Sequence, residues 1–203
     1  MANISDLEPL ARPYIQDCPK LLVTRELLRA ARTFFAKSQV WRETIHVGVG
    51  GGLNSGQINI EDGQAMIAIA DVRKMGDTKS LLKMPDKRNL PTCTGEPGVY
   101  TATTDTLYIG PIPTETYIAE VEVIVKPSLN ATTLPDVTLE DWGEQIACGA
   151  VESLLNMPDA AWFNPRGSIG HGNRFRAGIT EARIRVAQGF SNASPRASGG
   201  KFI

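Results

Sequence analysis

The chain has 203 residues, of which 42% are hydrophobic and 21% are charged, and its formal net charge at pH 7 is −1. These proportions are typical of a globular protein, and a chain of this length can bury about 70% of its unfolded surface. The near-neutral balance excludes a protein that binds polyanions over its whole surface.

The segment from residue 4 to residue 44 has the pattern of two helical pieces. They are separated by breaks at Arg12-Pro13-Tyr14 and at Cys18-Pro19. In the second piece one face is apolar, with Leu27, Leu28, Ala31, Phe34 and Phe35. The charged residues are expected on the other faces: Arg25, Glu26, Arg29, Arg32 and Lys37. None of these residues belongs to a catalytic motif, so the segment is interpreted as a packing element.

Residues 45–127 are rich in Gly, Pro, Thr, Val and Ile in short alternating stretches, which is typical of β-structure. The clearest predicted strands are residues 65–72 and 116–125. Residues 48–56 are rich in glycine, but they lack the Gly-Lys-Ser/Thr of a phosphate-binding loop and the third glycine of GxGxxG. We interpret them as a flexible hairpin tip that becomes ordered only against a neighbour.

Helical periodicity returns at Thr138, which is placed to cap a helix that ends near Pro158. Another helix is predicted from about residue 168 to residue 188. We therefore predict an α+β fold, with a helical bundle formed by the N- and C-terminal helices and a β-rich insertion between them. The predicted segments are 1–44 and 134–190 for the bundle, 45–133 for the insertion and 191–203 for an extended C-terminal tail.

The residue types that carry chemistry form no recognisable constellation. Three cysteines (Cys18, Cys93, Cys148) and two histidines (His46, His171) lack metal-ligand spacing, and no disulfide framework is expected. There is no GxSxG element. The carboxylates that open the helix at Thr138 are interpreted as favourable to the helix dipole rather than as a catalytic pair: Asp136, Glu140, Asp141 and Glu144. We expect no enzyme, no metal and no cofactor, and no membrane span, because no apolar run approaches about 18 residues.

Charge is unevenly distributed along the chain. From residue 166 onward the chain contains seven Lys and Arg residues against the single acidic residue Glu181. A solvated face, an acidic protein partner and a nucleic-acid surface would each fit this asymmetry. Four of these cations fall in the predicted last helix: Arg174, Arg176, Arg183 and Arg185.

A series of short motifs follows along most of the chain. It begins with Ile4-Ser5-Asp6-Leu7, Arg12-Pro13-Tyr14, Cys18-Pro19 and Gln39-Val40-Trp41-Arg42-Glu43. It continues with Leu107-Tyr108-Ile109-Gly110-Pro111-Ile112-Pro113, Leu134-Pro135-Asp136, Trp142, Ile146, Ala147, Gly149, Ala150 and Leu154-Leu155. It ends with Trp162-Phe163-Asn164-Pro165, Phe175, Gly178-Ile179, Ala182 and a basic-aromatic tail. The series resembles the head-to-tail connector, or adaptor, proteins of tailed bacteriophages.

This resemblance implies a homo-oligomeric ring, usually twelvefold, beneath the portal of a DNA-filled capsid. The implied partners are the portal protein, tail or nozzle proteins, and the packaged double-stranded DNA that passes through the channel. The implied location is the head–tail interface of the virion, with host cytoplasm before assembly. The resemblance also implies interface charges on the last helix, which we expect at Arg174, Arg176, Arg183 and Arg185. In such a protein the C-terminal tail contacts the portal, here through Arg196, Lys201 and Phe202.

Two other classes of function remain open from the sequence. One is a small-molecule-binding or catalytic α+β domain with the glycine-rich loop at a pocket, which the absence of an acid, base or metal constellation disfavours. The other is a DNA-binding accessory protein that uses the C-terminal arginines.

Overall fold

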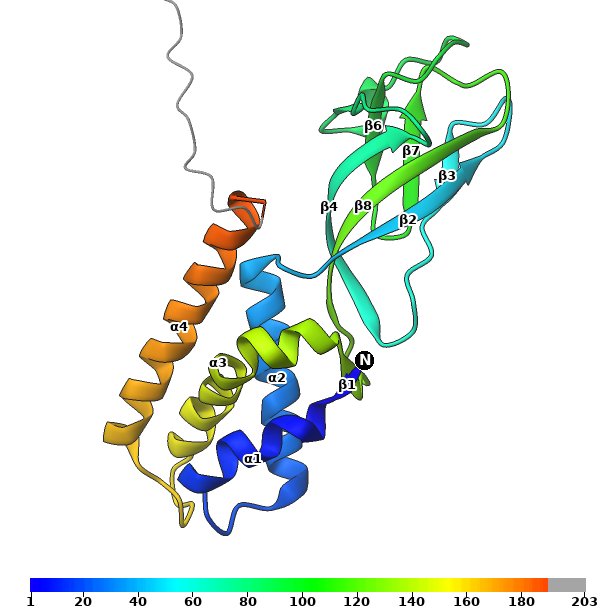
Figure 1. The fold of residues 1–203 in the computed structure, drawn as a ribbon. Helices are drawn as coiled ribbons and strands as arrows, with labels where there is room; N and C mark the ends of the chain where they lie inside the picture. Colours follow the sequence, from blue (N-terminus) through cyan, green and yellow to red (C-terminus); the bar gives the residue numbers. More distant parts are fainter. Residues whose placement is uncertain (190–203) are drawn as a thin grey trace, which may run out of the picture. The chain divides into compact units, whose positions relative to one another are not determined.

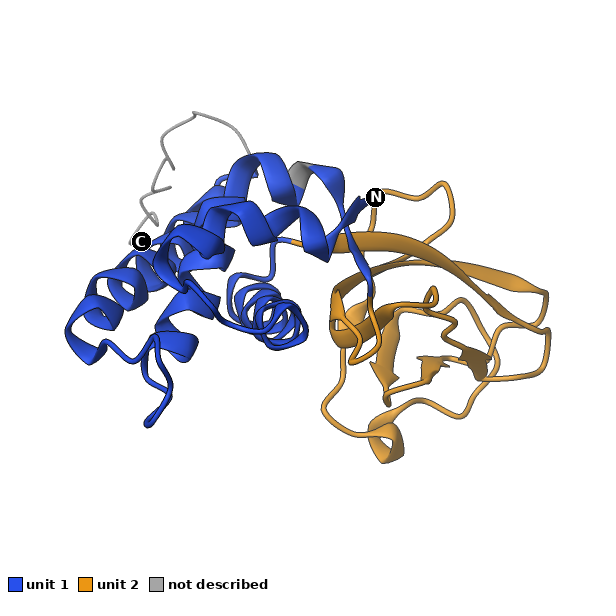
Figure 2. Cartoon of the chain, turned by 90° about the horizontal axis from the view of Figure 1, so that it is seen from below, with its two compact units in different colours: residues 1–40, 132–203 blue, residues 41–131 orange. Residues whose placement is uncertain are grey.

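The structure, a computed structural model, describes residues 1–189. The chain forms two compact units, which Figure 2 shows in blue and orange. In the described range, unit 1 contains residues 1–40 and 132–189, and unit 2 contains residues 41–131. The sequence analysis placed the corresponding boundaries after residues 44 and 133. Among the described residues, no helix combines the length and the apolar character that crossing a membrane requires.

The N-terminal part of unit 1 consists of several short elements followed by one long helix (Figure 1). They are β1 (Ala2–Asn3), the 3-10 helix η1 (Ile4–Leu7), α1 (Glu8–Ala11), the 3-10 helix η2 (Arg12–Tyr14) and α2 (Lys20–Ser38). Pro19 precedes α2 as its N-cap residue. The helix ends where Gln39 adopts a left-handed conformation with φ of 58° and donates its backbone N–H to Phe35 O at 2.9 Å.

The C-terminal part of unit 1 contains α3 (Asp136–Leu155) and α4 (Pro165–Ala187). Their aromatic side chains meet those of α2 in the core, where the Phe34 ring lies 5.6 Å from Trp142 and 6.3 Å from Phe175 between centroids. Helices α3 and α4 approach closely at Gly149, because a Cβ there would lie 2.8 Å from the ring of Phe175. A glycine is therefore required for this helix contact.

Unit 2 contains two of the sheets. The first has the order β2-β8-β4, with β2 (Arg42–Val49), β8 (Tyr117–Pro127) and β4 (Gln64–Lys74) all antiparallel. The central strand β8 buries alternate residues, including Ala119, Val121 and Val123. The second sheet has the order β3-β7-β6-β5, with β3 (Ser55–Gln57), β7 (Thr106–Gly110), β6 (Val99–Ala102) and β5 (Leu82–Lys83). A 3-10 helix, η3 (Lys87–Asn89), follows β5.

The glycine-rich loop between β2 and β3 is held within unit 2. The backbone N–H of Gly52 donates to Pro113 O at 2.8 Å, and Gly52 has a φ of 79°, which favours glycine. A Cβ at Gly51 would lie 2.8 Å from Thr114 O. The interpretation of this loop as a tip ordered only by a neighbour is therefore wrong, because residues 113–115 of the same unit contact it.

The predicted fold class, a bundle of terminal helices with a β-rich insertion, is wrong as stated. The described chain is α+β with four α-helices and nine strands in three sheets, and strands dominate its middle. Strands are not confined to the insertion, because β1 pairs with β9 (Thr133–Leu134) through Ala2↔Leu134 and Asn3↔Thr133. The helical pieces before α2 are short, and the α-helical path is interrupted at Arg12–Tyr14 and at Pro19, where the sequence predicts breaks.

Candidate interface on the last two helices

Helix α4 carries the arginines that the sequence analysis assigned to an interface. The helix begins where the Asn164 side chain accepts the backbone N–H of Gly167 at 3.0 Å, with Pro165 in the first position. Its buried face includes Phe175, Ile179 and Ala182. Because these apolar residues recur every three or four positions, the arginines fall on the remaining faces.

Two of the four arginines contact α3 within the same chain. Arg176 Nη1 lies 3.0 Å from Glu152 Oε1, and Arg185 Nη1 lies 3.4 Å from Asp141 Oδ2. Arg185 also pairs with Glu181 at 3.0 Å, and its guanidinium lies over the Trp142 ring at 4.6 Å. These arginines therefore link α4 to α3, in addition to any role toward a partner. Partly exposed pairs of this kind contribute about 0–1 kcal/mol each.

The other two helical arginines have different surroundings. Arg183 is exposed and forms no ion pair with any residue in the described range 1–189. Arg174 lines a hollow of about 240 Å³ between α3 and α4, whose other lining residues are Glu144, Gln145, Cys148, Ala177, Gly178 and Glu181. The predicted portal contacts Arg196, Lys201 and Phe202, and the predicted tail 191–203, lie outside the described residues.

Cys148 and His171 meet between α3 and α4, which the spacing of the two residues did not predict. Cys148 Sγ lies 3.5 Å from His171 Nδ1, and the ring of Tyr14 contacts His171 edge-on with centroids 4.4 Å apart. Burial raises the pKa of the Cys148 thiol, against the lowering effect of the nearby Arg174 guanidinium. Burial also lowers the pKa of His171, and Arg174 lowers it further. Both shifts favour a neutral thiol–imidazole pair over the thiolate–imidazolium pair that a cysteine nucleophile uses.

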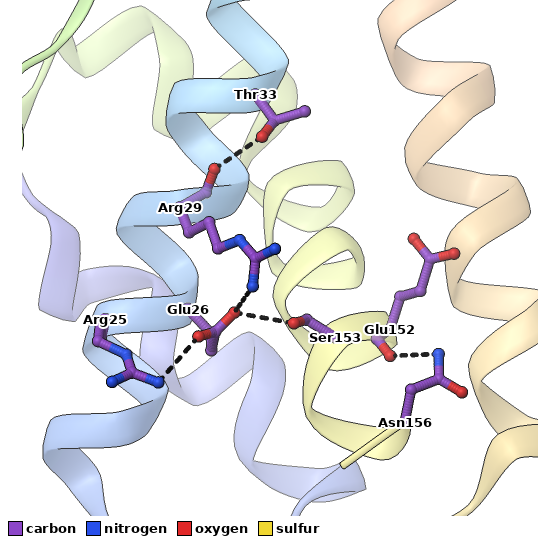
Figure 3. Close-up of polar contacts among 7 residues, drawn as sticks. All are labelled: Arg25, Glu26, Arg29, Thr33, Glu152, Ser153 and Asn156. Atoms are coloured by element: carbon purple, nitrogen blue, oxygen red, sulfur yellow. Dashed lines mark hydrogen bonds and ion pairs between the residues drawn. The ribbon is translucent and has the colours of Figure 1, made fainter.

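The carboxylate of Glu26 joins α2 to α3 (Figure 3). The side chain is buried, with Glu26 2% exposed, and its Oε2 accepts the Ser153 hydroxyl at 2.8 Å. Arg25 and Arg29 each place a guanidinium nitrogen 3.4 Å from the carboxylate while remaining largely exposed. The prediction that Glu26 lies on a polar face is wrong, because its position next to Leu27 brings it to the side of α2 that contacts α3.

Unit 2 contains a separate groove between β4 and β6. Its volume is about 500 Å³, and its lining includes Met66, Ile69, Met84, Tyr100 and Thr103, with Lys83 as the charged residue. Within residues 1–189, no group of three or more His, Cys, Asp or Glu side chains is placed to hold a metal ion. The described residues that best fit an interface are therefore those on α4 and around the α3–α4 hollow.

In comparisons with known proteins, no protein-family model matches the chain. No curated protein matches it in sequence either.

Proposed function

We propose that the protein is a structural, non-enzymatic head-to-tail adaptor of a tailed bacteriophage. In this role it forms a homo-oligomeric ring beneath the portal, bridges the portal to the tail or nozzle proteins, and extends the channel through which the double-stranded DNA passes. Its location would be the head–tail interface of the virion. The proposal rests on the series of motifs that resembles the adaptor family and on the surface that α4 exposes.

The observation that carries the proposal is the mixture of apolar and cationic residues on the exposed side of α4. Ile169 is 61% exposed and Ile184 is 50% exposed, and Ile184 directly follows the exposed Arg183. Protein interfaces combine an apolar core with enriched arginine, whereas a surface that binds single-stranded nucleic acid combines cations with aromatic side chains on which the bases stack. This surface therefore favours a protein partner over nucleic acid.

The residues of α3 and α4 that belong to the adaptor-like motif series are mostly core residues. Trp142, Ile146, Ala150 and Leu154 of α3 are buried, as are Phe175 and Ile179 of α4. These residues build the core of unit 1, so they are not available to a partner, whereas Ile169, Arg183 and Ile184 of α4 are exposed.

The test uses portal-containing heads that lack the adaptor. Wild-type protein should bind them, and the double variant Arg183→Glu/Ile184→Asp should not, although its circular dichroism and unfolding midpoint match the wild type. Removal of residues 191–203 should also abolish binding without unfolding the protein. The control is Lys79→Glu, an exposed charge change in unit 2, which should bind as the wild type does. Equal head binding by all four proteins would contradict the proposal.

A further inference from the structure

The hollow between α3 and α4 has the size and lining of a socket for one apolar side chain. Its volume of about 240 Å³ is below the range of about 300–1,000 Å³ that small-molecule pockets occupy. Cys148, Ala177 and Gly178 supply small or weakly polar lining. Glu144 and Glu181 also line it, so the socket combines apolar lining with carboxylates.

The charge around this hollow is negative in balance. Four carboxylates lie on it or beside it along α3 and α4: Glu140, Asp141, Glu144 and Glu181. Two guanidiniums oppose them, those of Arg174 and Arg185. Glu140 and Glu144 are exposed, and neither forms an ion pair with a residue in the range 1–189. A cationic partner would therefore gain attraction here.

Helix α2 presents a residue that matches the socket. Leu21 is 83% exposed, the highest value among the large hydrophobic residues of the described chain. Removing an exposed leucine side chain from water stabilises a complex through the hydrophobic effect. Lys20 directly precedes Leu21, and Arg25 lies one helical turn after Leu21 on the same face. Both cationic side chains are exposed. The α2 face thus combines one apolar side chain with two flanking positive charges.

The hollow cannot receive Leu21 of the same chain, because it faces away from α2. Ser153 of α3 contacts Glu26 of α2. Glu144 precedes Ser153 by nine residues, which is about two and a half helical turns, so the two residues lie on opposite faces of α3. A contact between Leu21 and the hollow must therefore join two copies of the chain.

We propose that Leu21 of one copy inserts into the α3–α4 hollow of a second copy, with Lys20 and Arg25 facing the carboxylates around Glu144. The contact joins two different surfaces of the same chain, so it repeats head to tail and generates a closed ring or an open filament. The proposed contact rests on the proposed adaptor function in one respect: that function requires the repeated contacts to close into a ring. The occupant is a second copy because its α2 face carries both the exposed leucine and the charge of opposite sign.

The direct test traps the contact through the native Cys148. Leu21→Cys is made in a Cys93→Ser background, which removes the exposed native thiol. Diamide then oxidises the thiols of Cys148 and of the introduced cysteine to a disulfide and is itself reduced to the hydrazine, at about pH 8.5, where the exposed introduced thiol is partly ionised and reacts with diamide first. We expect a ladder of covalent oligomers and a disulfide-linked peptide pair from positions 21 and 148. The matched control Leu129→Cys, also on an exposed aliphatic residue but in unit 2, should give no link to Cys148, and Cys148→Ser should remove the ladder.

A charge exchange tests the electrostatic part of the contact. Lys20→Glu and Glu144→Lys, each added to the trapping variant, should each lower the yield of the 21–148 link about fivefold, which corresponds to about 1 kcal/mol. The two changes together should restore the yield, because the pair is then reversed rather than broken. Lys37→Glu, on the same helix but away from Leu21, should leave it unchanged.

The outcomes separate this contact from the adaptor function. The inference would be overturned if no 21–148 link formed, or if links formed only between two introduced cysteines. It would also be overturned if neither charge change altered the yield of the 21–148 link. If such a protein still bound portal-containing heads, the adaptor function would stand and only the subunit contact would be rejected. A 21–148 link in a protein that fails to bind heads would support the contact and reject the adaptor.

Discussion

Arg185 and Trp142 stack across the contact between α4 and α3. The guanidinium of Arg185 lies 4.6 Å from the centroid of the Trp142 ring, and the same ring lies 5.6 Å from Phe34 of α2. Trp142 is therefore held by aromatic contact with α2 and by a cation from α4, and the carboxylates of Asp141 and Glu181 hold that cation. One arginine that the sequence assigned to an interface thus has a structural role in joining α4 to α3.

We predict that Arg185→Ala lowers the free energy of unfolding by about 1 kcal/mol, because it removes the stacking on Trp142 and two partly exposed ion pairs. Arg183→Ala, two residues away and exposed, should change it by less than about 0.5 kcal/mol. Urea unfolding followed by tryptophan fluorescence measures both. Equal losses in the two variants would show that Arg185 does not stabilise the α3–α4 contact.

A second prediction concerns the close approach at Gly149. Gly149→Ala should lower the free energy of unfolding by about 1–3 kcal/mol, because the new Cβ would lie 2.8 Å from the Phe175 ring. Gly170→Ala is the matched control on α4, where a Cβ meets nothing within 4 Å, and it should stabilise the protein by about 0.5–1 kcal/mol through helix propensity. Chemical denaturation of the two variants should give effects of opposite sign, and a gain of stability in both would refute the packing at Gly149.

The buried Glu26 gives a third prediction. Glu26→Gln retains the shape of the side chain but removes the negative charge that faces Arg25, Arg29 and the Ser153 hydroxyl. We expect a loss of about 1–3 kcal/mol in the free energy of unfolding, because hydrogen bonds to a buried charged group are replaced by weaker ones. Glu140→Gln, on the exposed side of α3, should have no measurable effect. If the two glutamates behave alike in thermal and urea unfolding, the Glu26 contacts do not stabilise unit 1.

The pH dependence of stability should report His171. Its pKa in the folded protein is lowered from the ordinary value of 6.5, first by burial and then by Arg174. The unfolded chain therefore binds more protons than the folded chain between these two pKa values, so the free energy of unfolding falls as the pH drops below about 6.5. Unfolding of His171→Gln and of the wild type, measured at several pH values from 8 to 5, should show a shallower fall for the variant. Identical profiles would contradict the lowered pKa.

Much of the local structure follows from sequence pattern. The predicted strand at residues 116–125 corresponds to β8 (Tyr117–Pro127), because alternating β-branched residues specify a half-buried strand. The helix predicted from Thr138 corresponds to α3, which begins two residues earlier after Pro135. In both cases the information lies within a short window of the chain.

The relationships that the sequence did not predict all depend on contacts between distant residues. In the sequence, Glu26 looks like the other charged residues of α2. It is buried only because α3 packs against it on the side that carries Ser153. Cys148 and His171 are 23 residues apart on different helices, so no local spacing marks them as a pair. The pairing of β1 with β9 joins residues at least 130 positions apart. Each strand has only two residues, which is too short to give a periodic pattern.

The adaptor proposal is tested most directly by imaging the portal vertex. Purified wild-type protein is added to portal-containing, adaptor-free heads, and the vertex is reconstructed by electron cryomicroscopy without imposed symmetry. The account predicts a new ring of density beneath the portal, into which copies of unit 1 fit side by side around the channel. A vertex that remains unchanged at saturating protein, with the protein recovered unbound, would contradict it.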